Sequence, residues 1–181
     1  CLVMGIVKSN AYGHGLVDFS QQLVQLGVNW LGVDSITEGL ALRRAGISQP
    51  ILILGYTLPN LLVQARQSNC SVTISSWDNL RVWAALPVDQ RPAVHLKLDT
   101  GMTRQGFIEQ DWPEVFEFWQ QQAGHNSLEG LYTHLAAAKN PSFPQLTQQQ
   151  LSAFNRAVQL ASQFQQKPLR HAAATAGALV F

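Results

Sequence analysis

The sequence predicts an α/β fold of the (β/α)8 TIM-type barrel class, incomplete here at about seven strands. Apolar strand-like runs alternate with segments of helical periodicity along the whole chain, a pattern typical of parallel strands joined by helical crossovers. The repeat is close to the ~30 residues of one strand–helix unit. Because such a barrel has about 250 residues, we expect this chain of 181 residues to stop one strand short. An open doubly wound sheet is the alternative, although no G-x-G-x-x-G fingerprint supports a dinucleotide site.

The expected strands are short apolar runs, and the expected helices carry apolar residues every three or four positions. In the first helix, Leu16, Phe19 and Leu23 share one face, and Gly27 follows as a stop signal. Thr37 is the expected N-cap of the second helix. We expect strands at 2–8, 30–34, 51–55, 71–75, 93–99, 128–134 and 169–174, and helices at 16–26, 37–45, 59–67, 77–86, 112–122 and 148–165.

Two further stretches lie outside this pattern. Residues 139–147 form a Pro-rich loop after the sixth strand, at the predicted catalytic face, where a loop can act as a rim or lid or be a plain surface connection. The glutamine runs at 120–122, 148–150 and 163–166 are expected to be solvated surface.

Composition narrows the class of protein. Apolar residues make up 46% of the chain, which excludes a disordered segment. Twelve basic and eleven acidic residues nearly cancel, so no nucleic acid or membrane held by bulk charge is expected. Cys1 and Cys70 form no close pair, so neither a disulfide framework nor a zinc site is indicated. No apolar run is long enough to span a bilayer.

The most informative stretch is Val-Lys-Ser-Asn-Ala-Tyr-Gly-His-Gly at residues 7–15, directly after the first apolar run. Lys8 is its first polar residue, and burial at a strand end disfavours the charged form of a lysine. A neutral lysine is a good nucleophile toward carbonyl groups, so a Schiff base is the natural chemistry. The side chain of Tyr12 can fold back over the same strand end, and Gly13 and Gly15 allow a sharp turn. An ordinary snorkelling lysine before a glycine turn is the alternative.

This nonapeptide resembles the pyridoxal-phosphate attachment motif of the alanine racemase family. The resemblance implies that Lys8 holds pyridoxal 5′-phosphate as a Schiff base and that Tyr12 lies near the cofactor phosphate. It extends over essentially the whole chain, and it implies one truncated domain over residues 1–181, without the C-terminal β domain of that family.

The fifth expected strand adds a second group of residues. The period of two places His95, Lys97 and Asp99 on the face that lines a barrel interior, where they must satisfy one another. The run Asp-Thr-Gly-Met-Thr-Arg then leaves the strand and resembles a family segment that ends in Arg104. The resemblance implies that Arg104 reaches the cofactor phenolic oxygen and the substrate carboxylate, and that Lys97 is either carbamylated or an ordinary ion-paired lysine.

Two later strand ends complete the predicted site. His134 resembles the family histidine that lies against the cofactor ring. Thr175 stands where the family commonly has a phosphate-binding serine, and with the amides near Ala176 it would form a phosphate cup. Ala174 departs from the asparagine common in the family, which puts one contact in doubt. Lys8, Arg104, His134 and Thr175 all follow the C-terminal ends of different strands, where active sites of such barrels gather.

The resemblance therefore implies a racemase that interconverts L- and D-alanine, with Lys8 as one base and a tyrosine of a partner subunit's C-terminal domain as the other. Serine is the alternative substrate. We expect a cytoplasmic homodimer that supplies D-alanine for peptidoglycan, and a chain that by itself is inactive. The rival interpretations are a single-domain protein of pyridoxal-phosphate homeostasis, an amino-acid decarboxylase with the same barrel, and a domain of a membrane-bound sensor or resistance protein.

Overall fold

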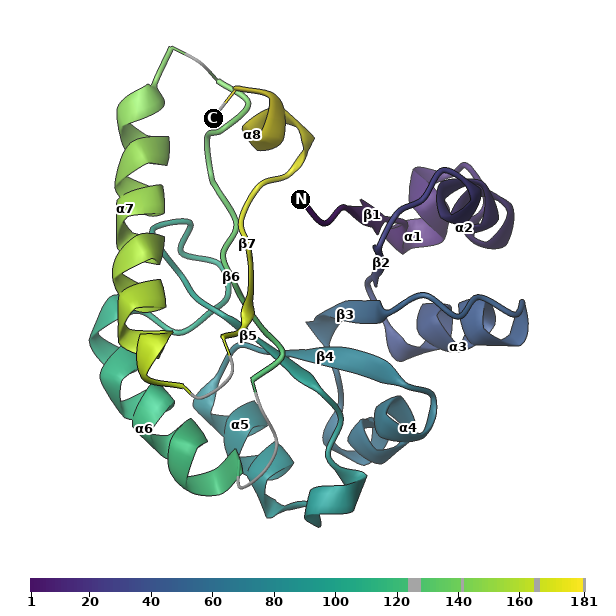
Figure 1. Ribbon diagram of the computed structural model, residues 1–181, viewed down its shortest axis with the longest axis horizontal. Coiled ribbons are helices and arrows are strands. Elements are labelled where there is room, and N and C mark those ends of the chain that lie inside the picture. Colours follow the sequence, from purple (N-terminus) through teal and green to yellow (C-terminus); the bar gives the residue numbers. More distant parts are fainter. Residues whose placement is uncertain (124–127, 141, 165–166, 181) are drawn as a thin grey trace. The chain divides into compact units, whose positions relative to one another are not determined.

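The computed structural model describes residues 1–123, 128–140, 142–164 and 167–180 (Figure 1). The chain divides into two compact units: Cys1–Thr73 with Ala85–Val94, and Ile74–Ala84 with His95–Phe181. The seven expected strands and six expected helices are confirmed in chain order, and two short helices, α1 (Lys8–Tyr12) and α8 (Thr175–Val180), are additional.

The first unit is built on four parallel strands that are neighbours in chain order: β1 (Met4–Ile6), β2 (Trp30–Val33), β3 (Ile51–Tyr56) and β4 (Cys70–Ile74). All four residues of β2 are buried, as expected for a parallel strand covered on both faces. The connections carry α2 (Leu16–Gln25), α3 (Ile36–Arg44) and α4 (Leu62–Gln67), the last preceded by the 3-10 turn η1 (Pro59–Leu61).

The start of α3 differs from the expectation. Its N-cap is Ser35 and not Thr37, because Ser35 has an extended backbone and its hydroxyl accepts a hydrogen bond from the Glu38 amide at 3.4 Å. Arg43, in the last turn of α3, donates to the carbonyls of Ile47 and Gln49 at 2.8 and 2.7 Å. Both ends of this helix are therefore tied to neighbouring backbone.

The second unit contains the parallel strands β5 (Val94–Lys97), β6 (Gly130–Tyr132) and β7 (Leu169–His171), again in chain order. Its helices are α5 (Trp77–Ala85), α6 (Trp112–Ala123), α7 (Pro144–Leu160) and α8, with 3-10 turns η3 (Glu109–Asp111) and η4 (Ala161–Gln163); a further such turn, η2 (Val88–Gln90), belongs to the first unit. Aromatic packing joins α5 to α6, since the rings of Trp83 and Trp119 stack with centroids 4.5 Å apart.

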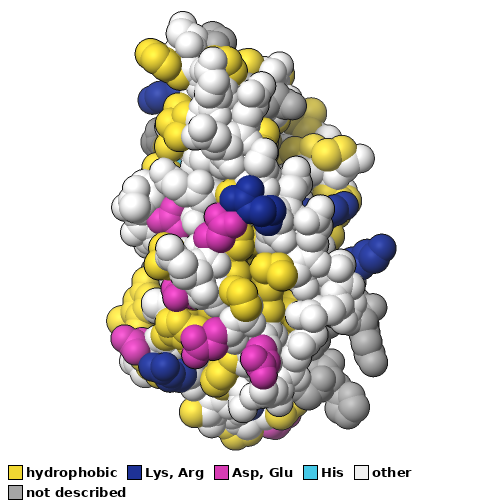
Figure 2. Space-filling model, turned by 90° about the vertical axis from the view of Figure 1, so that its left-hand side faces the viewer, with side chains coloured by type: hydrophobic (Ala, Val, Ile, Leu, Met, Phe, Trp, Pro, Cys, Tyr) yellow, Lys and Arg dark blue, Asp and Glu magenta, His cyan; other side chains and the backbone are white. Residues whose placement is uncertain are grey.

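Helix α7 starts earlier than the sequence pattern predicts. It begins at Pro144, whose fixed φ suits the first turn of a helix, so the expected loop 139–147 ends at Phe143. Pro141 lies outside the described residues. The surface over α6 and α7 carries acidic and basic side chains interspersed among uncharged ones (Figure 2). On this unit Arg156 makes a bidentate salt bridge with Glu109, in which its Nε and Nη2 donate to the two carboxylate oxygens at 2.7 and 2.8 Å.

Within the described ranges, no helix combines the length and apolar character needed to cross a bilayer. The same residues contain no cluster of three or more His, Cys, Asp or Glu side chains suited to a metal ion. Cys1 is exposed, Cys70 is buried, and both are free thiols.

Candidate active site

Lys8 lies at the carboxyl end of β1. The ladder to β2 continues one residue past the strand, because the Val7 amide donates to the Gly32 carbonyl at 2.8 Å, and Lys8 follows as the first residue of α1. The Lys8 side chain is 37% exposed, so its amine is less desolvated than that of a fully buried lysine would be. Its Nζ lies 3.8 Å from Oδ1 of Asp34, which follows the end of β2.

The chain after Lys8 makes a single left-handed turn. Residues 9–12 all have φ between 53° and 55°, and Gly13 and Gly15 continue with φ of 96° and 92°. For non-glycine residues this conformation costs roughly 1–2 kcal/mol each. Asn10 offsets part of that cost, since its carbonyl accepts from the Gly13 and Gly15 amides and its side-chain oxygen accepts from the Leu16 amide at 2.8 Å. Tyr12 emerges from the turn with 64% of its surface exposed.

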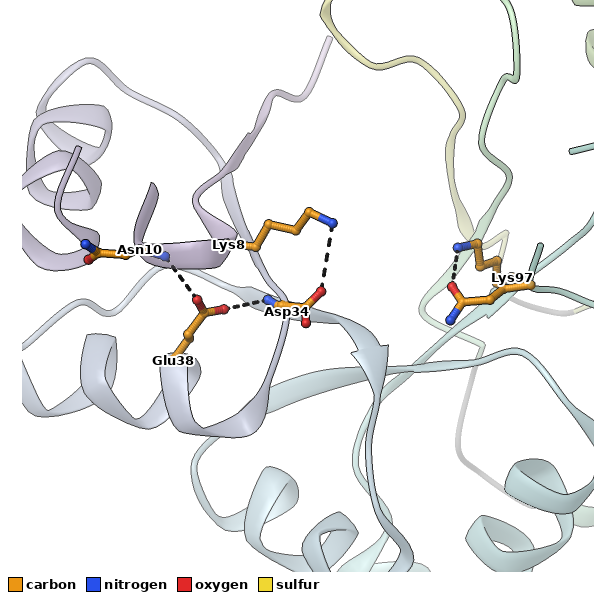
Figure 3. Close-up of polar contacts among 6 residues, drawn as sticks. Lys8, Asn10, Asp34, Glu38 and Lys97 are labelled. Atoms are coloured by element: carbon orange, nitrogen blue, oxygen red, sulfur yellow. Dashed lines mark hydrogen bonds and ion pairs between the residues drawn. The ribbon is translucent and has the colours of Figure 1, made fainter. Parts of the chain in front are cut away.

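The carboxylate of Glu38 accepts hydrogen bonds from two backbone segments, the turn after Lys8 and the end of β2 (Figure 3). Its Oε1 accepts from the Asn10 amide at 3.3 Å, and its Oε2 accepts from the Asp34 amide at 2.7 Å. The carbonyl of Asp34 in turn accepts from the Gly55 amide at 3.1 Å. A Cβ on Gly55 would lie 2.3 Å from that carbonyl oxygen, so the close approach requires glycine. The sequence pattern does not single out Glu38 or Asp34 as site residues, although an S-x-x-E pattern starts at Ser35.

In the second unit, Lys97 is buried, with 6% of its surface exposed, as are the other three residues of β5. Its Nζ donates to Oε1 of Gln105 at 2.9 Å (Figure 3). The same Nζ lies 5.5 Å from the centre of the Tyr132 ring. The expected partner Asp99 instead accepts from the amides of Gly101 and Thr103, at 2.8 and 3.0 Å, and so shapes the loop after β5.

Arg104 lies on this loop, next to Gln105. Its side chain is exposed, and its guanidinium has no hydrogen-bond or ion-pair partner within the part of the chain that the structure describes. The loop is therefore held by Asp99 and by the Lys97–Gln105 contact, while Arg104 remains available to an anion.

A buried polar cluster surrounds the ring of His171, on β7. Nε2 of His171 lies 2.8 Å from Nδ1 of His95, and Tyr132 stacks on His171 with ring centroids 4.6 Å apart. On the opposite side of the His95 ring, Nε2 of His95 lies 3.3 Å from a carboxylate oxygen of Glu129. Burial, and then the neighbouring His95, lower the pKa of His171 from 6.5 to about 3. The sequence pattern placed His95 inside but did not identify this cluster.

His134 follows the end of β6 by two residues and is half-buried. The backbone beside it is held by Gln150 of α7, whose Oε1 accepts from the Ala136 amide at 2.9 Å and whose Nε2 donates to the His134 carbonyl at 3.5 Å. Gln150 is fully buried, so the expectation that residues 148–150 are all solvated surface is wrong at this position.

Thr175 is the first residue of α8 and is exposed, with a hydroxyl that has no partner in the described ranges. Ala176 beside it is half-buried. Because β5, β6 and β7 are parallel, the segments that carry Arg104, His134 and Thr175 all leave the same edge of this unit's sheet.

Comparison with known proteins identifies the family. The family model described as "Alanine racemase, N-terminal domain" matches residues 1–181. An alanine racemase from Symbiobacterium thermophilum is 37% identical over 186 residues, covering 98% of this chain and 48% of the relative. A lysine racemase from Oenococcus oeni is 39% identical over 136 residues, covering 75% of this chain and 37% of that protein.

The fold comparison agrees. The crystal structure of alanine racemase from Corynebacterium glutamicum has a TM-score of 0.90 and 29% identity, covering 99% of this chain and 51% of that one. This likeness confirms the barrel class over the open doubly wound sheet. The chain spans about half the length of the alanine racemases that it matches. It belongs to the family of the alanine racemase N-terminal domain, the domain with which these enzymes bind pyridoxal phosphate.

Proposed function

We propose that this chain is the cofactor-binding barrel domain of a pyridoxal-phosphate-dependent racemase that interconverts L- and D-alanine. The observation that carries the proposal is Lys8, an accessible amine at the carboxyl end of β1 within a chain that the family model matches from end to end. Its amine is the group that would form the Schiff base with pyridoxal phosphate.

The residues present fit this cofactor. In the first unit, Lys8 would supply the amine, and Tyr12 follows it in the left-handed turn; in the second unit, the exposed hydroxyl of Thr175 and the amide of Ala176 would contact the phosphate. His134 would lie against the ring. The guanidinium of Arg104, which has no partner among the described residues, suits the phenolic oxygen and the substrate carboxylate, because its planar fork can donate to two oxygens at once. When bound, the cofactor withdraws electrons from the substrate Cα and acidifies its proton.

This chain's own residues then have distinct tasks. Lys8 takes and returns the Cα proton on one face of the substrate, as a base held next to a carboxylate. Arg104 orients the carboxylate, and Lys97, in its bond to Gln105, holds the loop that presents Arg104. The proposal includes carbamylation of Lys97, which would make this side chain anionic at the start of the loop that carries Arg104.

Alanine is the proposed substrate because the relatives that cover nearly all of this chain are named for it. Because one relative is a lysine racemase, the side chain of the substrate is the feature that the activity assay must identify. Serine is the smaller alternative substrate. We further propose a cytoplasmic homodimer whose D-alanine serves peptidoglycan synthesis.

The test is to load the protein with pyridoxal phosphate, add D-alanine and measure L-alanine. Inversion that is lost in Lys8→Ala supports the proposal. Carbon dioxide release from lysine, ornithine or arginine would indicate a decarboxylase instead. Cofactor binding at Lys8 without turnover of any amino acid would indicate a homeostasis protein.

A further inference from the structure

Glu38 lies in the first turn of α3, yet its carboxylate serves two segments outside that helix. One oxygen accepts from the amide of Asn10, two residues after Lys8, and the other accepts from the amide of Asp34, whose carboxylate lies 3.8 Å from the Lys8 amine (Figure 3). Glu38 therefore ties the turn after β1 to the end of β2.

This tie is more than a helix cap. In a capping box, the glutamate at the third helical position reaches back to the amide of the N-cap residue itself. Here the N-cap is Ser35, but Glu38 reaches Asp34, one residue earlier, and also Asn10, from a different connection. The second contact adds nothing to α3 and acts on the turn that begins at Lys8.

The turn that Glu38 holds is one that needs support. Four successive non-glycine residues, 9–12, are left-handed, a conformation that persists only where surrounding contacts over-determine it. Within the turn, the carbonyl oxygen and the side-chain oxygen of Asn10 accept hydrogen bonds from amides at 13–16. Its amide is satisfied from outside the turn, by Glu38.

The same carboxylate fixes Asp34. The Asp34 amide is held by Glu38 and its carbonyl by the Gly55 amide, so its backbone is fixed on both sides of the residue. With the backbone held, the Asp34 carboxylate stays 3.8 Å from the Lys8 amine.

We propose that Glu38 is the positioning residue for Lys8: it bridges the two strand-end turns and so fixes both the direction of the Lys8 side chain and its carboxylate partner. This inference rests on the proposed role of Lys8. The bridge requires two acceptor oxygens facing two amide donors, which a carboxylate provides and a carboxamide does not. Glu38→Gln keeps the size and one contact, whereas Glu38→Ala removes both.

The matched control is Ser35→Ala, which weakens the start of α3 but leaves the Glu38 carboxylate in place. We would titrate wild type and the three variants with pyridoxal phosphate, follow the visible absorbance of the lysine imine, and map the reduced adduct. Thermal unfolding is measured alongside. We expect Ser35→Ala to bind as the wild type does, Glu38→Gln to form the Lys8 imine about tenfold more weakly, and Glu38→Ala to be weaker still, with Glu38→Gln no less heat-stable than Ser35→Ala.

Equal imine formation in wild type and Glu38→Gln would overturn the inference, and so would an equal loss in Ser35→Ala and Glu38→Gln. Failure of the wild type itself to form an imine at Lys8 would instead overturn the proposed function. Amide hydrogen exchange tests the bridge without cofactor and without any variant: protection at both Asn10 and Asp34 in the wild type is expected, and fast exchange at either would refute the bridge. A variant that does not fold therefore leaves the inference testable.

Discussion

His95 and His171 are joined by a hydrogen bond of 2.8 Å between Nδ1 of the first ring and Nε2 of the second. The carboxylate of Glu129 faces Nε2 of His95 at 3.3 Å and can only accept. This arrangement is electrostatically favourable when His95 carries its proton on Nε2 and His171 donates to Nδ1 of His95. His171 is packed between His95 and the Tyr132 ring, where burial disfavours its charged form.

The first prediction concerns acid stability. Burial and His95 lower the pKa of His171 to about 3 in the folded chain, below its ordinary value of 6.5. Between these two values the unfolded chain binds more protons, so the stabilisation is fully present above pH 6.5 and is lost as the pH falls toward 3. We expect the free energy of unfolding to fall by up to about 1.4 kcal/mol per pH unit in this window, measured by urea denaturation at a series of pH values.

The control for this prediction is His171→Phe, which keeps a ring against Tyr132 but cannot titrate. Glu129, Lys97 and Tyr132, which also face the cluster, remain unchanged in the variant. Its stability should vary less steeply with pH between 6.5 and 3. A slope equal to that of the wild type would assign the acid sensitivity to other groups.

The second prediction concerns Gly130, on β6. A Cβ at this position would meet the buried His95 ring at 2.2 to 2.6 Å, and that ring is held by Glu129 and His171. Gly130→Ala should therefore destabilise the protein by about 1–3 kcal/mol, the usual cost of overpacking. Chemical denaturation measures this change. Gly177→Ala is the control, because its Cβ would meet atoms at 3.4 Å or more; similar stability of the two variants would contradict the packing around His95.

The third prediction concerns the reactivity of the lysines. Lys97 is 6% exposed and bonded to Gln105, whereas Lys139 and Lys167 are exposed. Limited acetylation of the native protein should modify Lys139 and Lys167 and spare Lys97, and the denatured protein should be modified at all three, as read by peptide mass spectrometry. Ready acetylation of native Lys97 would contradict the burial of this side chain and the predicted register of β5.

The order of strands and helices follows from the sequence because apolar periodicity and the glycine and proline signals reflect local preferences. Alternation also places His95 and Lys97 on one face of β5, and both are buried, as are the alternate residues Val94 and Leu96. Helix caps are harder to predict, because Ser35 and Thr37 are both good caps and only the backbone conformation decides between them.

The contacts that shape the candidate site could not be predicted, because they join residues far apart in the chain. Nothing near Glu38 in the sequence indicates that it holds the amide of Asn10, and nothing in a glutamine-rich run singles out Gln150 as the buried one. The left-handed turn at 9–12 is equally hidden, since only Asn10 among its residues favours that conformation.

The measurement that tests the account most directly is the site of the cofactor. The protein is incubated with pyridoxal phosphate, reduced with borohydride, digested and mapped by mass spectrometry, with Lys8→Ala treated in parallel. We expect the phosphopyridoxyl group on Lys8, and no visible imine absorbance in Lys8→Ala. Label on Lys97, Lys139 or Lys167 with Lys8 unmodified would contradict the assignment of Lys8 as the cofactor lysine.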